Sequence, residues 1–284
     1  TYLPEMKLNY YTDDNKKVSC RNLLSHTSGL PLHFQYYYDD DTVTIPTMSQ
    51  TIHNYGIIVD PPASRFAYAN LGYGILGQII SSISSKSFND YMIDEIFLPM
   101  GMTQTTIDIS VKTKNRLAKR YDLKGNLVPF SFCDTPGAGN VSTTLVDLMK
   151  FGQFHLGKVS EDGKFLLSSK TIKSMQEKQY TDNANGRNSY GLGWFLDDDK
   201  YYEYKMVHHA GGMDGIDAMI RLVPEKGIVV AAISNQYSEY THALTEQILL
   251  EMIPDLKYAE TKPVLNHDLI AQDKQIKLEQ ADMI

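Results

Sequence analysis

The last third of the chain carries the pattern that most restricts the fold. Residues 216–223 and 227–234 have the length and apolar character of strands, and the second holds the nearly continuous run Ile228–Ile233. Pro224-Glu-Lys-Gly227 lies between them and is typical of a tight turn. The two segments are therefore expected to pair as an antiparallel hairpin.

Helical periodicity dominates the middle of the chain. Leu76, Ile79, Ile80 and Ile83 recur at the spacing of one apolar helix face. Asn70 precedes them and is expected to cap the N-terminus of their helix, because a short polar side chain can accept a backbone N–H there.

Further elements are expected on either side of these two. Short strands are expected at 190–194 and 205–209. Helices are expected over 88–98, from Thr144 with a start that resembles a capping box, over about 166–178, and along Leu244, Ile248 and Met252 up to Pro254. A helical middle followed by an antiparallel hairpin and a closing helix predicts an α+β fold rather than alternating β-α-β units.

Bulk composition excludes several classes of partner. The 284 residues are 42% hydrophobic and 21% charged, which is ordinary for a folded chain with a sizeable core. The net charge of −7 and the scattered basic residues argue against nucleic-acid binding. No apolar stretch approaches the roughly 20 residues that a membrane span needs.

No metal or cofactor site is expected. Cys20 and Cys133 are too few for a metal cluster, and although they could pair, they are expected to be free thiols. The adjacent His208 and His209 would point to opposite faces of a strand. Gly72-Tyr-Gly-Ile-Leu-Gly77 spells the dinucleotide-binding fingerprint, but no apolar strand precedes it. Its glycines are expected to allow close helix packing instead.

Two short motifs provide candidate catalytic groups. Tyr68-Ala-Asn70 stands at the expected start of a helix, where a tyrosine beside a lysine loses its proton more readily and an asparagine can hold an amide. His209-Ala-Gly211, followed by Gly212, offers an imidazole next to glycines that admit a substrate backbone. Each motif alone also fits a structural role, as a packed tyrosine with a helix cap or as a histidine beside a glycine turn.

Taken in order, these segments and several others resemble the class C β-lactamase-like and penicillin-binding-protein-like serine hydrolases. The resemblance runs from Tyr2 to about Pro254 and implies an antiparallel sheet flanked by helices, with a mostly helical subdomain. The matching segments are Tyr2-Leu-Pro-Glu, Leu23–Pro31, Phe66–Tyr73, Leu98–Met102, Pro136–Gly139 with Ser142-Thr143, Tyr190–Trp194 and His209-Ala-Gly211.

The resemblance implies a role for each candidate residue. Tyr68 would be the general base, Asn70 would bind the substrate amide, and His209 would replace the lysine of the Lys-Thr-Gly motif. Gly211 and Gly212 would lie along the substrate, and the Gly212 N–H would help form the oxyanion hole.

One motif that this chemistry requires is missing. The nucleophile of such enzymes is a serine activated by a lysine one helical turn later, and no Ser-x-x-Lys occurs in the 284 residues. In the resembled proteins that helix precedes the segment matched by Tyr2-Leu-Pro-Glu. The chain is therefore expected to be a hydrolase domain at 1–262 that is incomplete at its N-terminus, with 263–284 as a linker or tail.

This absence leads to three structural expectations. Tyr68, Asn70 and His209 should still line one cleft. The strand 228–233 should lie at a sheet edge that is bare, or paired by a second chain or by 264–284. A large cavity or loose packing should mark the place of the missing helix.

Two functions fit these patterns. The favoured one is a bacterial serine hydrolase acting through an acyl-enzyme on peptidoglycan D-alanyl peptides, β-lactams, D-amino-acid peptides or esters, with this chain inactive alone. The His-Ala-Gly motif favours an esterase or peptidase by resemblance. The alternative is a non-catalytic β-lactamase-like binding or scaffold module. The resemblance also implies a location outside the cytoplasmic membrane, whereas the substrate and the oligomeric state stay open.

Overall fold

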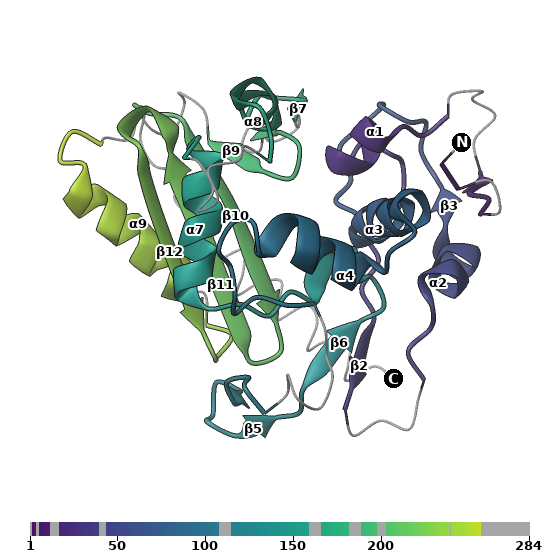
Figure 1. Ribbon diagram of the computed structural model, residues 1–284, viewed down its shortest axis with the longest axis horizontal. Helices are drawn as coiled ribbons and strands as arrows, with labels where there is room; N and C mark the ends of the chain where they lie inside the picture. Colours follow the sequence, from purple (N-terminus) through teal and green to yellow (C-terminus); the bar gives the residue numbers. More distant parts are fainter. Residues whose placement is uncertain are drawn as a thin grey trace, which may run out of the picture.

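The computed structural model describes residues 2–3, 6–11, 17–39, 44–107, 115–158, 166–181, 189–197, 203–238 and 240–256. The expected linker or tail at 263–284 lies outside these residues, so its assignment stays a prediction. Within the described chain, one large sheet with two covering helices stands beside a mostly helical part (Figure 1). None of the described helices is long and apolar enough to cross a membrane.

The main sheet has six antiparallel strands in the order β12-β11-β10-β9-β8-β7. Their bounds are Tyr180–Thr181 (β7), Ser189–Tyr190 (β8), Phe195–Asp197 (β9), Met206–Met213 (β10), Ile216–Val223 (β11) and Ile228–Ser234 (β12). An antiparallel sheet with separate helices confirms the α+β class.

The expected hairpin is formed by β11 and β12, whose register runs from Asp217 opposite Ser234 to Val223 opposite Ile228. Gly227 closes its turn at a φ of +65°, which glycine adopts without steric strain. The strand predicted over 190–194 is wrong, because β8 ends at Tyr190 and β9 begins at Phe195. Gly193, at a φ of +83°, reverses the chain between them.

Two helices cover opposite faces of this sheet: α7 (Leu145–His155) and α9 (Tyr240–Met252). Successive side chains of β11 point to opposite faces of the sheet. Ile220 and Leu222 therefore pack in the core under α7, and Val223 packs in the core under α9. Figure 1 shows both helices running along the sheet.

The predicted apolar face of α9 is wrong although the helix itself is confirmed. Leu244 and Met252 are each 53% exposed, whereas Thr245 and Leu249 are fully buried. Burial of Thr245 is possible because its hydroxyl donates to the carbonyl of Thr241 inside the helix. A prediction based on the spacing of large apolar residues therefore does not identify a buried helix face that includes threonines.

The start of α7 is capped on one side only. The Thr144 hydroxyl accepts the N–H of Asp147, as expected. The Asp147 carboxylate does not return to the cap, because it accepts the N–H of Gln104 and the hydroxyl of Thr105. The expected reciprocal capping box is thus absent, and Asp147 instead ties α7 to the distant loop that contains Gln104 and Thr105.

β12 lies at the end of the sheet. Among the described residues it pairs only with β11, so its outer edge has no strand partner there. The expected edge position of the apolar run is confirmed. Pairing by 264–284 or by a second chain stays a prediction.

The helical part is built around α3 (Asn70–Ser84). Gly72 packs against Leu23, and Gly77 against Phe88, so the predicted use of these glycines in close helix packing is confirmed. Asn70 is the first helical residue rather than the cap. The buried face differs from the predicted one, because Ile83 is 64% exposed while Leu71 is fully buried.

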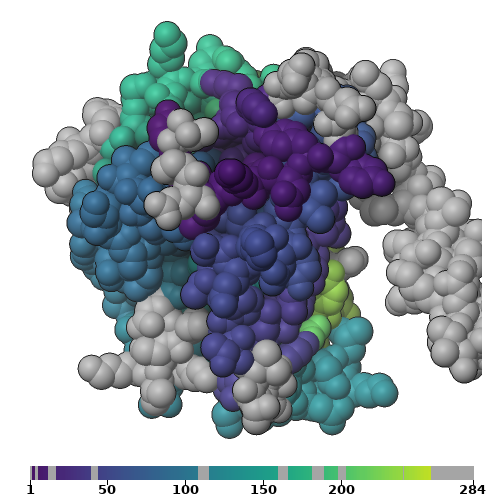
Figure 2. Space-filling view, turned by 90° about the vertical axis from the view of Figure 1, so that its right-hand side faces the viewer, coloured from purple at the N-terminus to yellow at the C-terminus, as the bar shows by residue number. Residues whose placement is uncertain are grey.

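The remaining elements surround α3 or connect it to the sheet. Figure 2, which faces the helical side, shows the N-terminal third of the chain gathered there. The predicted helix over 88–98 is α4 followed by a π-helical stretch, and the one at 166–178 is the shorter α8. The bounds are Asn9–Tyr10 (β1), Cys20–Leu24 (α1), Tyr36–Tyr38 (β2), Met48–Tyr55 (α2), Ile57–Ile58 (β3), Phe88–Tyr91 (α4), Met92–Phe97 (η1), Arg120–Tyr121 (β4), Leu127–Val128 (β5), Ser131–Cys133 (β6), Pro136–Gly139 (α6) and Ser169–Met175 (α8).

Candidate active site

A cavity of about 790 Å³ lies between the helical part and the main sheet. Its lining comes from the start of α3, from β6 and α6, and from β10, β11 and β12. The structure brings all five predicted site residues to this cavity: Tyr68, Asn70, His209, Gly211 and Gly212. Residues about 140 positions apart in the sequence therefore line one cleft, as the sequence analysis expects.

Tyr68 and His209 lie next to each other in the wall of the cavity. The Tyr68 hydroxyl lies 3.5 Å from His209 Nε2, and His209 Nδ1 lies 2.6 Å from the carbonyl oxygen of Ala210. The carbonyl can only accept, so Nδ1 carries the proton and Nε2 presents its lone pair to the Tyr68 hydroxyl. Burial lowers the pKa of His209, which favours this neutral imidazole.

The surroundings of Tyr68 keep its phenol protonated. The ring lies between His26, with centroids 4.0 Å apart, and Phe195, at 6.2 Å and nearly parallel. Burial in this aromatic stack raises the pKa of Tyr68. No lysine is among the described residues that line the cavity. The easier ionisation that a neighbouring lysine would provide is therefore absent from this structure.

His26 fixes the loop that carries Tyr68, a role that the sequence analysis missed. Its Nδ1 accepts the backbone N–H of Ala69 at 3.1 Å, and its carbonyl accepts that of Ala67 at 2.8 Å. His26 adopts a φ of +54°, uncommon for a residue with a side chain. Burial lowers its pKa to about 3, so the ring is a neutral acceptor at physiological pH.

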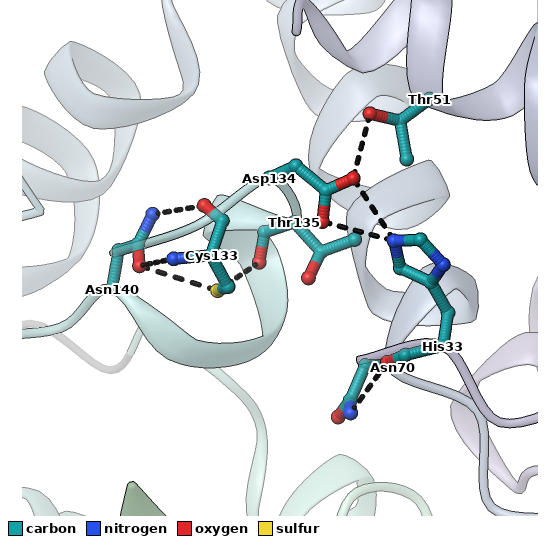
Figure 3. A network of polar contacts seen from close by, with 7 residues as sticks. All are labelled: His33, Thr51, Asn70, Cys133, Asp134, Thr135 and Asn140. Carbon is teal, nitrogen blue, oxygen red and sulfur yellow. Dashed lines mark hydrogen bonds and ion pairs between the residues drawn. The ribbon is translucent and has the colours of Figure 1, made fainter. Parts of the chain in front are cut away.

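Asn70 is held by a buried polar network (Figure 3). Its amide nitrogen donates to the carbonyl of His33 at 3.0 Å. The His33 ring contacts both carboxylate oxygens of Asp134, at 2.9 and 3.0 Å, and the Thr51 hydroxyl donates to the same carboxylate at 3.0 Å. Three segments far apart in the sequence thus fix the carbonyl that orients Asn70, and no local motif reveals this arrangement.

The glycines of β10 leave one side of the strand open. Open space surrounds the position where a side chain at Gly211 would project, whereas the ring of Tyr237 covers Gly212. β9 pairs with β10 only over Met206–His208, so among the described strands nothing pairs with that edge of β10 beyond His208. An extended chain could pair there with backbone groups beside His209.

The serines of the Leu23–Pro31 segment serve the fold. Ser25 and Ser28 are buried, and the Ser25 hydroxyl donates to the carbonyl of Arg21 at 2.8 Å. The Ser28 hydroxyl accepts the N–H of Leu30 at 3.4 Å. Neither serine lines the cavity, so neither is placed to attack a substrate held beside Tyr68.

The adjacent residues His208 and His209 have different surroundings. His208 contacts Asp197 at 3.3 Å and stacks on Phe195, whereas His209 reaches the cavity beside Tyr68. In the described part of the chain, no three His, Cys, Asp or Glu side chains are grouped as metal ligands. Cys20 and Cys133 are both free thiols.

Comparison with known proteins identifies the family. A family model described as "Beta-lactamase" matches residues 1–251. The chain belongs to the β-lactamase family. Structural similarity agrees, since the octameric penicillin-binding protein homologue from Pyrococcus abyssi superposes with a TM-score of 0.71 at 25% identity, over 88% of this chain and 58% of that one.

Two other similar proteins indicate how the chain relates to longer ones. "Protein flp" of Staphylococcus aureus (strain NCTC 8325 / PS 47) is 26% identical over 274 residues, which are 93% of this chain and 52% of that protein. The chain thus spans about half the length of this relative. A β-lactamase/D-alanine carboxypeptidase from Yersinia pestis, solved with citrate, has a TM-score of 0.66 at 21% identity, over 88% of this chain and 74% of that one.

Proposed function

We propose that this chain is the larger part of a serine hydrolase domain whose nucleophile lies on a segment outside the 284 residues. The observation that carries the proposal is the convergence of Tyr68, Asn70 and His209 on one large cavity in a chain without Ser-x-x-Lys. A helix bearing serine and lysine, placed in that cavity, would bring a hydroxyl to the Tyr68–His209 pair.

Tyr68 acts in this proposal as the proton carrier. Its phenol is protonated here and donates toward His209 Nε2, and an added lysine would lower its pKa and allow it to accept the serine proton. His209 then keeps the tyrosine oriented and can exchange a proton with it. Asn70 Oδ1 accepts a substrate N–H, because its amide nitrogen is held by His33.

The open edge of β10 supports an extended acyl substrate. Gly211 leaves room for substrate atoms, and a backbone N–H at Gly212 would stabilise the oxyanion of the tetrahedral intermediate. D-Alanyl peptides, β-lactams, D-amino-acid peptides and esters all present such a carbonyl. A location outside the cytoplasmic membrane is part of the same proposal and rests on family resemblance.

The alternative is a binding or scaffold module that performs no acyl transfer. The raised pKa of Tyr68 and the lowered pKa of His209 favour it as long as no lysine enters the site. Covalent labelling separates the two functions.

The test compares this chain with the full-length protein that its gene encodes. Both are treated with a fluorophosphonate and with a fluorescent penicillin, then assayed with nitrocefin and p-nitrophenyl esters. We expect the full-length protein to be labelled on a serine of a Ser-x-x-Lys motif and this chain to show no label or hydrolysis. Tyr68→Phe in the full-length protein should lower the labelling rate by about 100-fold or more, since general acid–base catalysis contributes this much.

The matched control is Tyr190→Phe, which removes a hydroxyl from a buried tyrosine that does not line the cavity. Its labelling rate should stay at the wild-type value. An unlabelled, inactive full-length protein would support the scaffold alternative. Labelling of Ser25 or Ser28 in this chain would show that the nucleophile is misassigned.

A further inference from the structure

A buried arginine borders the cavity without a carboxylate partner. Arg120 belongs to β4 and is only 6% exposed, yet it lines the cavity. Lysine and arginine are rarely buried unless an anion pairs with them. Within the described chain, no carboxylate oxygen lies within 4.0 Å of its guanidinium.

The contacts of Arg120 use only part of its hydrogen-bonding capacity. Nη1 donates to the Ser131 hydroxyl at 3.0 Å, and lies 3.4 Å from the Ser131 carbonyl and 3.5 Å from the Met213 sulfur. Nε is buried without a partner. No described residue accepts from Nη2 either, so two adjacent donors of the planar fork are unused.

The nearest carboxylates are engaged elsewhere. Asp214 accepts the Tyr38 hydroxyl at 2.5 Å, and Asp39 accepts the Phe130 N–H at 3.1 Å. Burial lowers the pKa of Arg120 to about 10, and the longer-range fields of Asp39 and Asp214 offset this in part. The guanidinium stays charged at neutral pH and rests on the Phe130 ring, 3.8 Å from its centroid.

The position of Arg120 relative to His209 determines how far from the scissile carbonyl a substrate group must lie to reach the guanidinium. Its guanidinium lies at Met213, four residues beyond His209 along β10. Four residues of a strand span about 13 Å. A substrate extended along the open edge of β10 would therefore place a group roughly this far from its scissile carbonyl beside Arg120.

We propose that Arg120 binds a carboxylate on the acyl side of the substrate, so that the cavity selects acyl donors with an anionic group roughly 13 Å from the scissile carbonyl. A guanidinium binds a carboxylate through charge-assisted hydrogen bonds, and Nη2, which no described residue uses as a donor, is the group available for them. The inference rests on the proposed function in treating the cavity as an acyl-substrate site.

The test measures binding by this chain, so that it does not depend on catalysis. The probes are N-suberoyl-D-alanyl-D-alanine and its 7-carbamoylheptanoyl analogue, which differ only in carboxylate against carboxamide at the acyl end and, when extended, place that group about 13 Å from the scissile carbonyl. NMR titration gives the dissociation constant of each. We expect the wild type to bind the suberoyl peptide at least 10-fold more tightly, since hydrogen bonds between charged groups contribute about this much.

Three variants separate binding from structure. Arg120→Met should abolish the preference for the carboxylate, Arg120→Lys should retain part of it, and Arg65→Met at the surface should retain all of it. Thermal unfolding of Arg120→Met should occur at or above the wild-type temperature, because methionine replaces an unpaired buried charge. A structural role alone predicts a lower unfolding temperature with the ligand preference unchanged.

The outcomes separate the two proposals. An unchanged preference in Arg120→Met, or equal or absent binding of both peptides up to millimolar concentration, overturns the role of Arg120. Failure of the full-length protein to label overturns the hydrolase function and leaves the binding preference to be judged on its own.

Discussion

At the scale of single residues, Asp134 carries an unusual share of the contacts around the site. It is 2% exposed, and its carboxylate forms hydrogen bonds with the His33 ring and with the Thr51 hydroxyl. Because His33 also holds Asn70 through its carbonyl, a change at Asp134 should reach the site. A buried carboxylate of this kind is costly to disrupt, since its partners are then left unsatisfied.

We expect Asp134→Ala to lower the free energy of unfolding by about 3 kcal/mol, because it breaks a buried polar pair. Asp134→Asn should lose less, since an amide oxygen can still accept from Thr51. Urea unfolding of this chain measures both. The control, Asp255→Ala, removes a surface partner of Lys226 whose side chain is 56% exposed, and should leave the unfolding midpoint unchanged. Equal midpoints for Asp134→Ala and wild type would contradict the structural role of the network.

The sequence predicts some site residues and misses others for one physical reason. Tyr68, Asn70 and His209 sit in short motifs with their own local signature, so their common site follows from the order of the motifs. Asp134 and Arg120 act through partners that are distant in the sequence, and neither has a local signature. Only the fold brings such partners together.

At the scale of elements, the sequence predicts which segments are helices and strands better than it predicts their buried faces. β11 matches its predicted bounds and β12 begins one residue later, because long apolar runs around a glycine turn leave few alternatives. The segment 190–194 contains the turn between β8 and β9 because Gly193 takes a left-handed conformation. The face of α9 is misassigned because two threonines pack inward with their hydroxyls satisfied: Thr241 donates to the Asp217 carboxylate on β11, and Thr245 donates to the carbonyl of Thr241.

α9 offers a direct test of which face is buried. We expect Leu249→Ala to lower the free energy of unfolding by about 3 kcal/mol, within the range for a leucine removed from a packed core. Leu244→Ala, on the same helix and 53% exposed, should change it by less than about 0.5 kcal/mol. Both are read from urea unfolding curves. Comparable losses for the two variants would mean that the periodic face predicted from the sequence is the buried one.

At the scale of the whole molecule, three histidines with lowered pKa values link stability to pH. His26 and His209 both lie beside Tyr68, and His155 is the last residue of α7, where its ring packs against Trp194. Burial lowers the pKa of His26 to about 3 and that of His155 to about 4, and it also lowers the pKa of His209. All three are therefore neutral in the folded chain at pH values where an unfolded histidine takes up a proton.

Stability should accordingly fall as pH drops below about 6.5, the pKa of an unfolded histidine. Below that value the unfolded chain binds more protons than the folded one, so the free energy of unfolding decreases with acidification. For His155 the loss continues to about pH 4, at a limiting slope of about 1.4 kcal/mol per pH unit. Urea unfolding midpoints at about pH 7.5, 6 and 5, values chosen to lie on both sides of about 6.5, measure how steeply the stability of the whole chain falls with pH.

His155→Gln separates the histidine contribution from that of the carboxylates. The variant should be less stable than wild type at high pH, because glutamine fits the aromatic surroundings of His155 poorly, but it should lose less stability on acidification. His53→Gln, at an exposed position of α2, should leave the slope unchanged. An identical slope for His155→Gln and wild type would mean that His155 takes up its proton in the folded chain as readily as in the unfolded one.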